Sequence, residues 1–207
     1  NLQNLFGFKD STHFLIEVDG EVQGWIALLN PRLGHAAIEI GNVYFSHKMK
    51  KSKAATEAIF LLLKQCFKYG FRRVEWKCDD ANAPSKAAAL RFGFQYEGLF
   101  RQDRIVKNRN RNTVWFSIID EEWSDLEKTY QQWLSPENFD AQGFQNLRLR
   151  DGRQRIAQGH VDAHEHRAQA GTAEHHAHRH LVGRNAQVFG REGLQVLGVA
   201  GVCHACG

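Results

Sequence analysis

Short apolar runs separated by turn residues alternate with longer helical stretches over the first two thirds of the chain. Phe14–Val18 and Val22–Leu29 flank an Asp-Gly pair, which is among the strongest signals for a tight β-hairpin. Ala36–Phe45 is a third β-rich run, and Gly41 in its middle predicts a bulge or a close backbone approach. These runs predict three consecutive strands.

A helix follows, because apolar side chains recur at helical spacing within Ala54–Tyr69, and Gly70 is typical of the position just past a helix end. Asp120–Leu134 is another helical stretch, which Pro136 ends. Between them lie four further predicted elements: the strand Arg72–Cys78, the helix Ser85–Phe92, and the strands Phe94–Arg101 and Thr113–Ile119. The order β-β-β-α-β-α-β-β-α predicts an α+β (mixed α/β) fold, a mostly antiparallel sheet covered by helices.

Residue usage changes sharply near residue 135. All 11 lysines lie at or before Lys128, all five tryptophans at or before Trp133, and no serine follows Ser135, whereas eight of the 11 histidines come later. This shift predicts a folded domain at 1–135 and a low-order, His-rich tail at 136–207. Large apolar side chains are sparse in much of the tail, which therefore buries too little surface to offset its ordering entropy.

Two alternatives to plain disorder remain open for the tail. A structural zinc site is one, because four clustered histidines (His175, His176, His178 and His180) precede a terminal Cys203-His204-Ala205-Cys206, although a single Cys-x-x-Cys is a weak motif. The other is that residues 152–207 come from a wrong reading frame or from translation past a stop, and are not native protein.

The net charge of +4 favours an acidic partner, but it does not predict a dedicated nucleic-acid-binding protein. No apolar run reaches the roughly 18 residues of a spanning helix, so we expect no membrane partner. Four cysteines are too few for a disulfide scaffold and favour reduced thiols in a cytoplasmic compartment. The chain begins with Asn1, which predicts a processed chain or a fragment.

The strongest chemical feature is a basic loop, Ser46–Lys53, that runs straight into a helix N-terminus. The first N–H groups of a helix lack intrahelical partners, and the helix dipole adds partial positive charge there, so the loop is suited to a pyrophosphate. Charge and close backbone approach come from three lysines and two small residues: Lys50, Lys51, Lys53, Ala54 and Ala55. The alternative is a solvated basic loop without a ligand.

Five stretches together suggest a family: IEIGNVYF, AATEA, RRVEWKCDDANAPSKAAALRFGFQYEG, FRQ and RNRNTVWFSIID. In this order they cover roughly residues 22–125, and the chain resembles the GNAT superfamily of acetyl-CoA-dependent N-acetyltransferases. More narrowly, it resembles the RimL-like branch, the ribosomal-protein N-acetyltransferase type. The resemblance implies that the first strand and helices of the domain are missing, so that the chain is N-terminally truncated.

The resemblance implies a sheet whose third and fifth strands splay apart at a bulge near Gly41–Phe45. The pantetheine arm of acetyl-CoA would lie in that gap, the diphosphate would sit on the loop amides, and Ser85 would approach the thioester sulfur. The implied coenzyme-binding residues are Val43, Phe45, Lys50, Lys51, Ser52, Lys53, Ala54, Ala55, Asn82 and Ser85. No metal is implied.

Acetyl transfer by direct attack needs a neutral amine, a polarised thioester carbonyl and a proton for the departing thiolate. A Ser85 hydroxyl can supply the proton, and Glu39 is the best candidate base, acting through water. The alternatives are a helix N-cap for Ser85 and an outward-facing strand carboxylate for Glu39. His35 is a weaker base candidate, and Cys78 reads as a packed strand residue.

Two positions depart from the family pattern. Lys53 and Ala55 stand where relatives often have glycine, so we expect the loop to keep ordinary helical geometry. Ala89 stands where many relatives have a tyrosine acid, which leaves that role to Ser85 or water. The predicted function is acetyl transfer to a primary amine, either a protein N-terminus or a small amine. The alternative is a non-catalytic module that binds CoA, or that binds RNA or the ribosome through the basic hairpin Lys107–Arg111.

Overall fold

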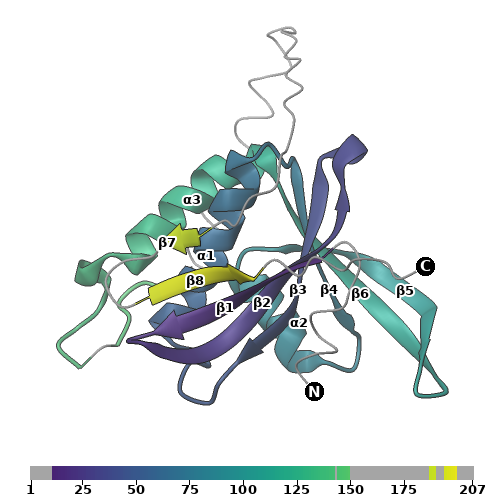
Figure 1. Ribbon diagram of the computed structural model, residues 1–207, viewed down its shortest axis with the longest axis horizontal. Helices are drawn as coiled ribbons and strands as arrows, with labels where there is room; N and C mark the ends of the chain where they lie inside the picture. The colour runs from purple at the N-terminus through teal and green to yellow at the C-terminus, as the bar shows by residue number, and fades with distance from the viewer. Residues whose placement is uncertain (1–10, 143, 150–186, 190–193, 200–207) are drawn as a thin grey trace, which may run out of the picture.

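The computed structural model describes residues 11–142, 144–149, 187–189 and 194–199. Its strands form one sheet in the order β5-β6-β4-β3-β2-β1-β8-β7 (Figure 1). The strands are β1 (Ser11–Val18), β2 (Glu21–Arg32), β3 (Ala37–Phe45), β4 (Arg73–Asp79), β5 (Gln95–Val106), β6 (Arg109–Ile119), β7 (Gln187–Phe189) and β8 (Leu194–Val199). The helices are α1 (Lys53–Lys68), α2 (Ala83–Arg91) and α3 (Asp120–Leu134), with short 3-10 turns at Leu33–His35 and Pro136–Asn138. The predicted order of strands and helices through α3 is confirmed.

The first hairpin turns where its sequence predicts. Asp19 and Gly20 have φ of 52° and 80°, the left-handed values that a tight two-residue hairpin turn requires. The turn places Val18 opposite Glu21 and sets the antiparallel register of β1 and β2.

A bulge interrupts β3 close to its middle glycine, as predicted. Trp25 of β2 pairs with Tyr44, and Ala27 pairs with Gly41, so one β2 residue faces two residues of β3. The extra residue is accommodated by Asn42, which has a left-handed φ of 47°. The bulge redirects the second half of β3.

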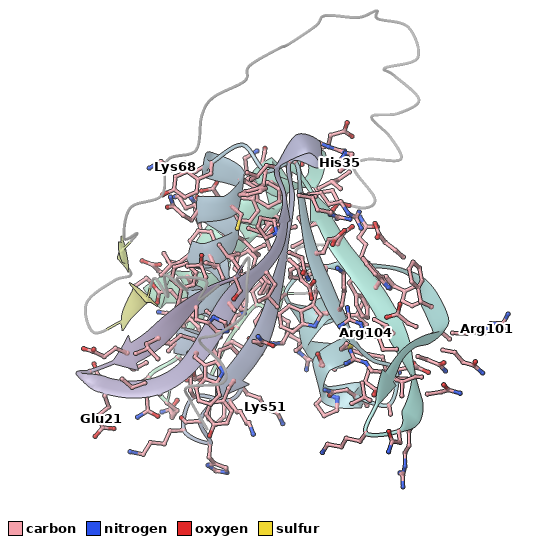
Figure 2. All side chains as sticks on the ribbon, turned by 45° about the vertical axis from the view of Figure 1, so that its right-hand side comes forward. Glu21, His35, Lys51, Lys68, Arg101 and Arg104 are labelled. Atoms are coloured by element: carbon pink, nitrogen blue, oxygen red, sulfur yellow. The ribbon has the colours of Figure 1, made fainter. Side chains whose placement is uncertain are left out.

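Just before the bulge, β3 leaves its other neighbour. The parallel pairing of β3 with β4 covers only residues 37–39 and 73–75. β4 continues along β6 to Asp79. Figure 2 shows the two halves of the sheet meeting near His35 and spreading apart towards Lys51. The separation of two strands was predicted, but the prediction of the fifth strand as the second of them was wrong. β3 separates from β4, the fourth strand of this chain. The fifth strand, β5, pairs only with β6 in the described sheet.

Successive residues of β4 point to opposite faces of the sheet, as strand geometry requires. Val74, Trp76 and Cys78 belong to the hydrophobic core that the helices cover, whereas Glu75 and Lys77 pair with other charged side chains on the opposite face. This division gives the sheet one apolar face and one face with buried charges.

The core is closed by contacts between α1 and α3. Phe60 stacks on Tyr130 with ring centroids 5.2 Å apart, and Phe67 stacks on Trp123 at 4.8 Å. Such aromatic pairs add stabilisation beyond the area that they bury. They fix α1 against α3, and so help to hold the N-terminus of α1 in position.

Ordered structure continues beyond residue 135, the predicted domain boundary. Phe139 packs edge-on against Trp133, and Leu149 is 3% exposed within the core. Two segments of the predicted low-order tail, β7 and β8, are strands, and β8 pairs antiparallel with β1. The candidate zinc residues lie outside the described residues. Within the described part, no helix combines the length and apolar character needed to cross a bilayer.

Candidate active site

A cleft of about 850 Å³ opens where β3 and β4 diverge. Its walls are the second half of β3, the loop before α1, the end of β4 and α2. Seven of the ten predicted coenzyme-binding residues line it: Val43, Phe45, Lys50, Lys51, Ala55, Asn82 and Ser85. Ser52 and Ala54 line a separate hollow beside the β1–β2 hairpin. The Lys53 ammonium lies over the Phe139 ring, 4.6 Å from its centroid.

The cleft side of β3 offers free backbone groups. The Ser46 N–H donates to the Gln23 carbonyl at 2.8 Å, so Ser46 faces β2. Backbone polar groups alternate along a strand, and therefore Phe45 and Val43 direct theirs away from β2, towards the gap. This is the arrangement that an extended amide-bearing ligand needs if it is to pair with β3.

The basic loop is more strained than its sequence predicts. Lys51 has a φ of 63°, a left-handed value that costs a residue with a Cβ about 1–2 kcal/mol. The expectation that the loop keeps ordinary helical geometry throughout is therefore wrong at Lys51. Such strain is typical of functional loops, because the surrounding structure must compensate for it.

Three of the six amides from Lys50 to Ala55 already have protein partners. The N–H groups of Lys50 and Ser52 donate to backbone carbonyls, and that of Ala55 donates to the Ser52 hydroxyl at 3.1 Å, which makes Ser52 the N-cap of α1. The amides of Lys53 and Ala54 occupy the first two helical positions, where no intrahelical acceptor exists. An anion at this end of α1 is therefore met by these two amides and the helix dipole.

The start of α2 differs from the prediction in one residue's role. The Asn82 side chain accepts the Ser85 N–H at 3.1 Å, and Pro84 stands in the first turn. Asn82 is therefore the N-cap and Ser85 lies inside the helix, so the alternative of Ser85 as N-cap is wrong. Because its Oδ1 holds the cap, Asn82 presents its amide Nδ2 as the donor available to a ligand in the cleft.

The Ser85 hydroxyl sits at the floor of the cleft between two polar partners. Its oxygen accepts a hydrogen bond from Trp76 Nε1 at 3.1 Å, which leaves the hydroxyl hydrogen to donate either to Cys78 or into the cleft. Cys78 is the second neighbour: burial raises the pKa of its thiol, and a hydrogen bond with Ser85 partly opposes that rise. Cys78 is thus kept as a neutral thiol, in agreement with its prediction as a packed residue.

Glu39 lies beside the cleft, and it is 7% exposed. Its Oε2 accepts hydrogen bonds from Asn30 Nδ2 at 2.7 Å and from Lys77 Nζ at 2.9 Å. Its Oε1 lies 3.4 Å from the point where a Cβ on Gly41 would stand, and Gly41 lines the cleft. The alternative of an outward-facing, solvated carboxylate is therefore wrong, because Glu39 is buried and paired.

Sequence reasoning missed the ion-pair network that holds Glu39. Lys77 bridges Glu39 to Glu75, and Glu75 also contacts Arg73 and Arg32. Burial alone would raise the pKa of Glu75, but hydrogen bonds from Arg73, Lys77 and Arg32 outweigh burial and lower it. The available signal was the alternation Arg-Val-Glu-Trp-Lys-Cys-Asp in β4, which places charges on one face.

The network borders a second cavity of about 510 Å³ on the sheet face opposite the helices. Its lining includes His35, Arg73, Glu75 and Trp115. Lys77 connects the two cavities, since it lines the cleft and contacts Glu75. His35 therefore lies at the second cavity and not at the cleft.

Two cleft residues were also not predicted as ligands. Arg91 at the end of α2 and Arg111 of β6 both line the cleft. Arg111 belongs to the basic hairpin that was considered for RNA binding, yet its Nε lies 3.8 Å from an Asp79 carboxylate oxygen. Both arginines add positive charge to the walls.

Comparison with known families gives one match, to the acetyltransferase (GNAT) family, over residues 1–94. A comparison with curated proteins found no match. Solved structures similar to this chain are numerous, and the three described next share 30–47% sequence identity with it.

A GCN5-related N-acetyltransferase from Brucella melitensis is 47% identical, with a TM-score of 0.64 over 65% of this chain and 62% of that one. A GNAT-family acetyltransferase from Chromobacterium violaceum is 44% identical, with a TM-score of 0.54 over 59% and 63%. A third structure, named an acetyltransferase, is 30% identical, with a TM-score of 0.61 over 65% and 70%. The matched region thus spans less than two thirds of the first two relatives.

Proposed function

Because this chain belongs to the GNAT family of acetyltransferases, we propose that it transfers the acetyl group of acetyl-CoA to a primary amine by direct attack. The family membership supports acetyl transfer in general. The amine acceptor, the coenzyme contacts and the catalytic roles below are proposals for this chain.

One observation carries the proposal: an open strand edge leads directly to a basic helix N-terminus. Val43 and Phe45, on the part of β3 that is not paired with β4, line the same cleft as Lys50, Lys51 and Ala55 at the start of α1. An extended pantetheine arm pairs with the strand edge, and its diphosphate lies at the helix start. Few other ligands combine a peptide-like arm with two phosphates.

Ser85 donates its hydroxyl proton towards the sulfur of the departing thiolate. Trp76 occupies the oxygen of this hydroxyl as a hydrogen-bond donor, so the Ser85 hydrogen points away from the indole, and a thioester sulfur in the cleft would take the place of Cys78 as its acceptor. The C–S bond of the thioester breaks as the amine nitrogen forms its bond to the carbonyl carbon. The thiol leaves with the proton that Ser85 or a water supplies, and the proton that the nitrogen loses as it becomes an amide replaces it.

Glu39 accepts the proton of the attacking ammonium through a water. Its Oε2 is held by Asn30 and Lys77, which leaves Oε1 directed towards Gly41 at the cleft wall. The amine must be neutral to attack, so this deprotonation precedes the formation of the new C–N bond. Both protein N-termini and small amines meet this requirement, and the RimL-like assignment stays a prediction.

Calorimetric titration with acetyl-CoA, combined with an assay of CoA thiol release, tests the proposal. We expect Lys50→Ala and Asn82→Ala each to weaken binding about 10-fold, the loss of roughly one charge-assisted or well-aligned hydrogen bond. Lys48→Ala is the matched control, because Lys48 belongs to the same loop but lines the hollow beside the β1–β2 hairpin. Failure of the wild-type protein to bind acetyl-CoA would refute the proposal.

A panel of acceptors then separates the amine classes. Peptides with free and with blocked N-termini, a polyamine and an amino sugar are offered with acetyl-CoA. Thiol release with any free amine, and none with its blocked form, supports amine acetylation. Coenzyme binding without release for every acceptor would favour the non-catalytic alternative.

A further inference from the structure

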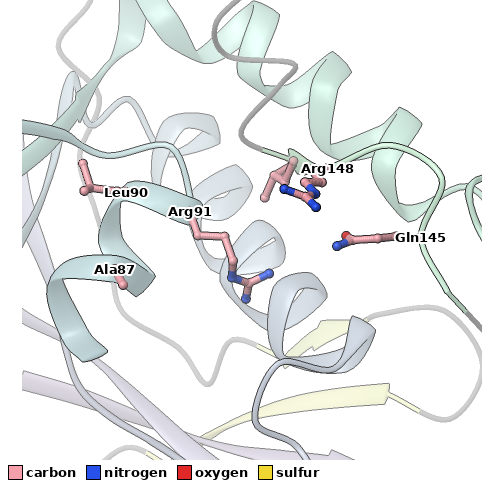
Figure 3. Close-up of a pocket in the computed structure, with 6 residues that line it drawn as sticks. Ala87, Leu90, Arg91, Gln145 and Arg148 are labelled. Atoms are coloured by element: carbon pink, nitrogen blue, oxygen red, sulfur yellow. The ribbon is translucent and has the colours of Figure 1, made fainter. Parts of the chain in front are cut away.

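A third cavity lies next to the cleft, and its polar side chains among the described residues are two arginines and a glutamine. It has a volume of about 360 Å³ and lies between α2 and the segment that follows α3. Figure 3 shows Arg91 extending into this space from α2, with Arg148 and Gln145 reaching it from the other side. The described lining contains no carboxylate. Ala87 and Arg91 line both this cavity and the cleft, so the two are adjacent.

Arg91 is held in place without an acidic partner among the described residues. Its Nη1 donates to Thr56 Oγ1 at 3.0 Å, and its guanidinium lies 4.4 Å from the centre of the Phe92 ring. Burial lowers the pKa of this guanidinium, and no described carboxylate forms an ion pair with it. Thr56 and Phe92 thus fix the position of the Arg91 charge, but neither of them neutralises it.

Two other half-buried cations among the described residues have acidic partners. Arg73 contacts both Glu75 and Glu97, and Lys77 contacts both Glu39 and Glu75. A buried charge without a counter-ion is costly, and proteins normally pair it. The contrast between these cations and Arg91 indicates that the counter-ion of Arg91 comes from a ligand.

Gln145 also presents a hydrogen-bond donor to this cavity. Its Oε1 accepts the Trp133 indole N–H at 2.9 Å, which leaves the amide Nε2 as the group available to the cavity. Arg148 adds a second positive charge at the exposed side. Two guanidinium groups and an amide donor suit a phosphate dianion, because arginine binds phosphate oxygens in a two-pronged geometry.

We propose that this cavity binds the 3′-phosphate on the ribose of CoA, with Arg91 as the preorganised donor and Arg148 as the second cation. The inference rests on the proposed function, since the coenzyme must first occupy the cleft. Its diphosphate then lies at the start of α1, where Thr56 in the first turn holds Arg91, and the nucleotide end continues past Arg91. The cavity volume suits a phosphorylated ribose and not the whole coenzyme.

Calorimetry with CoA and dephospho-CoA, which lacks only the 3′-phosphate, tests the inference on the full chain. We expect the wild-type protein to bind CoA about 10-fold more tightly than dephospho-CoA. Arg148→Gln should weaken CoA about 10-fold and dephospho-CoA less than about 2-fold. Arg101→Gln is the matched control: it removes the same charge from β5, which contributes no described residue to this cavity, and should change neither affinity.

The outcomes separate this inference from the proposed function. Equal affinity of the wild-type protein for the two ligands, or an equal loss of both in Arg148→Gln, would overturn the 3′-phosphate assignment while leaving the acetyl-CoA cleft in place. Binding of neither ligand would overturn both. A loss confined to CoA, with Arg101→Gln unchanged, supports the assignment.

Discussion

The ion-pair network on the charged face of the sheet makes a quantitative prediction for Glu75→Gln. Glu75 is 2% exposed and accepts from Arg73 at 2.9 Å, from Lys77 at 3.1 Å and from Arg32. Removing one partner of a buried ion pair typically costs about 3–5 kcal/mol, because the remaining charges lose their counter-ion.

The lower end of that range applies here. After the substitution Arg73 still contacts Glu97, Lys77 still contacts Glu39, and Arg32 is partly exposed, so no cation is left wholly buried and unpaired. We therefore expect a loss of about 3 kcal/mol in the free energy of unfolding, or a fall in Tm of roughly 6–12 °C for a chain of this length.

Urea and thermal unfolding followed by circular dichroism measure this loss. Glu21→Gln is the matched control, because it also removes one carboxylate, but from an exposed 3.6 Å contact with Lys48 that is worth less than about 1 kcal/mol. A loss for Glu75→Gln no larger than that of Glu21→Gln would refute the reasoning. The network would then contribute little to stability.

The difference between wild type and Glu75→Gln should also depend on pH. The pKa of Glu75 is lower in the folded than in the unfolded state, so its stabilisation is fully present above the unfolded-state pKa. It is lost as pH falls through the folded-state pKa. The two unfolding curves should therefore converge in acid, and a constant difference down to the lowest accessible pH would contradict the assignment.

Three further predictions follow from single residues. The free energy of unfolding of Lys51→Gly should exceed that of Lys51→Ala by about 1 kcal/mol, because glycine relieves the left-handed strain while both substitutions remove the charge. Equal free energies of unfolding would show that the loop is unstrained. Asn82→Ala should cost about 1 kcal/mol of stability through loss of the α2 cap, and full stability by urea unfolding would argue against that cap. Burial raises the pKa of Cys66 to about 12, so a thiol reagent at pH 8 should modify Cys78, at the cleft wall, faster than Cys66, and acetyl-CoA should slow that reaction. Mass spectrometry of the native protein checks the site of modification, and a faster Cys66 would contradict it.

Much of the fold follows from local sequence signals. The Asp-Gly pair predicts the first hairpin, and the helical spacing and Gly70 predict α1 and its end. Gly41 predicts the bulge because glycine within a strand is otherwise unfavourable. The start of α2 was missed by two residues, although Asn82 followed by Pro84 is a recognisable N-cap signal.

Features that depend on contacts between distant segments could not be predicted in this way. The pairing of β8 with β1 joins residues about 180 positions apart, and nothing in either segment specifies the other. The burial of Glu39 requires Lys77 and Asn30, which lie on two other strands. Likewise, the third cavity, lined by Arg91 and Arg148, exists beside the cleft only because the chain after α3 returns to α2.

The parallel contact of β3 with β4 is short, and it sets Glu39 directly opposite Glu75. Like charges facing each other across strands repel, so this alignment holds only while the Lys77 ammonium sits between them. A shift of this register by one position would move Glu39 to the other face of the sheet. The Lys77 ammonium would then keep only Glu75 of its two carboxylate partners. Lys77 thus favours a single register of β3 and β4. That register fixes the point at which the two halves of the sheet begin to separate.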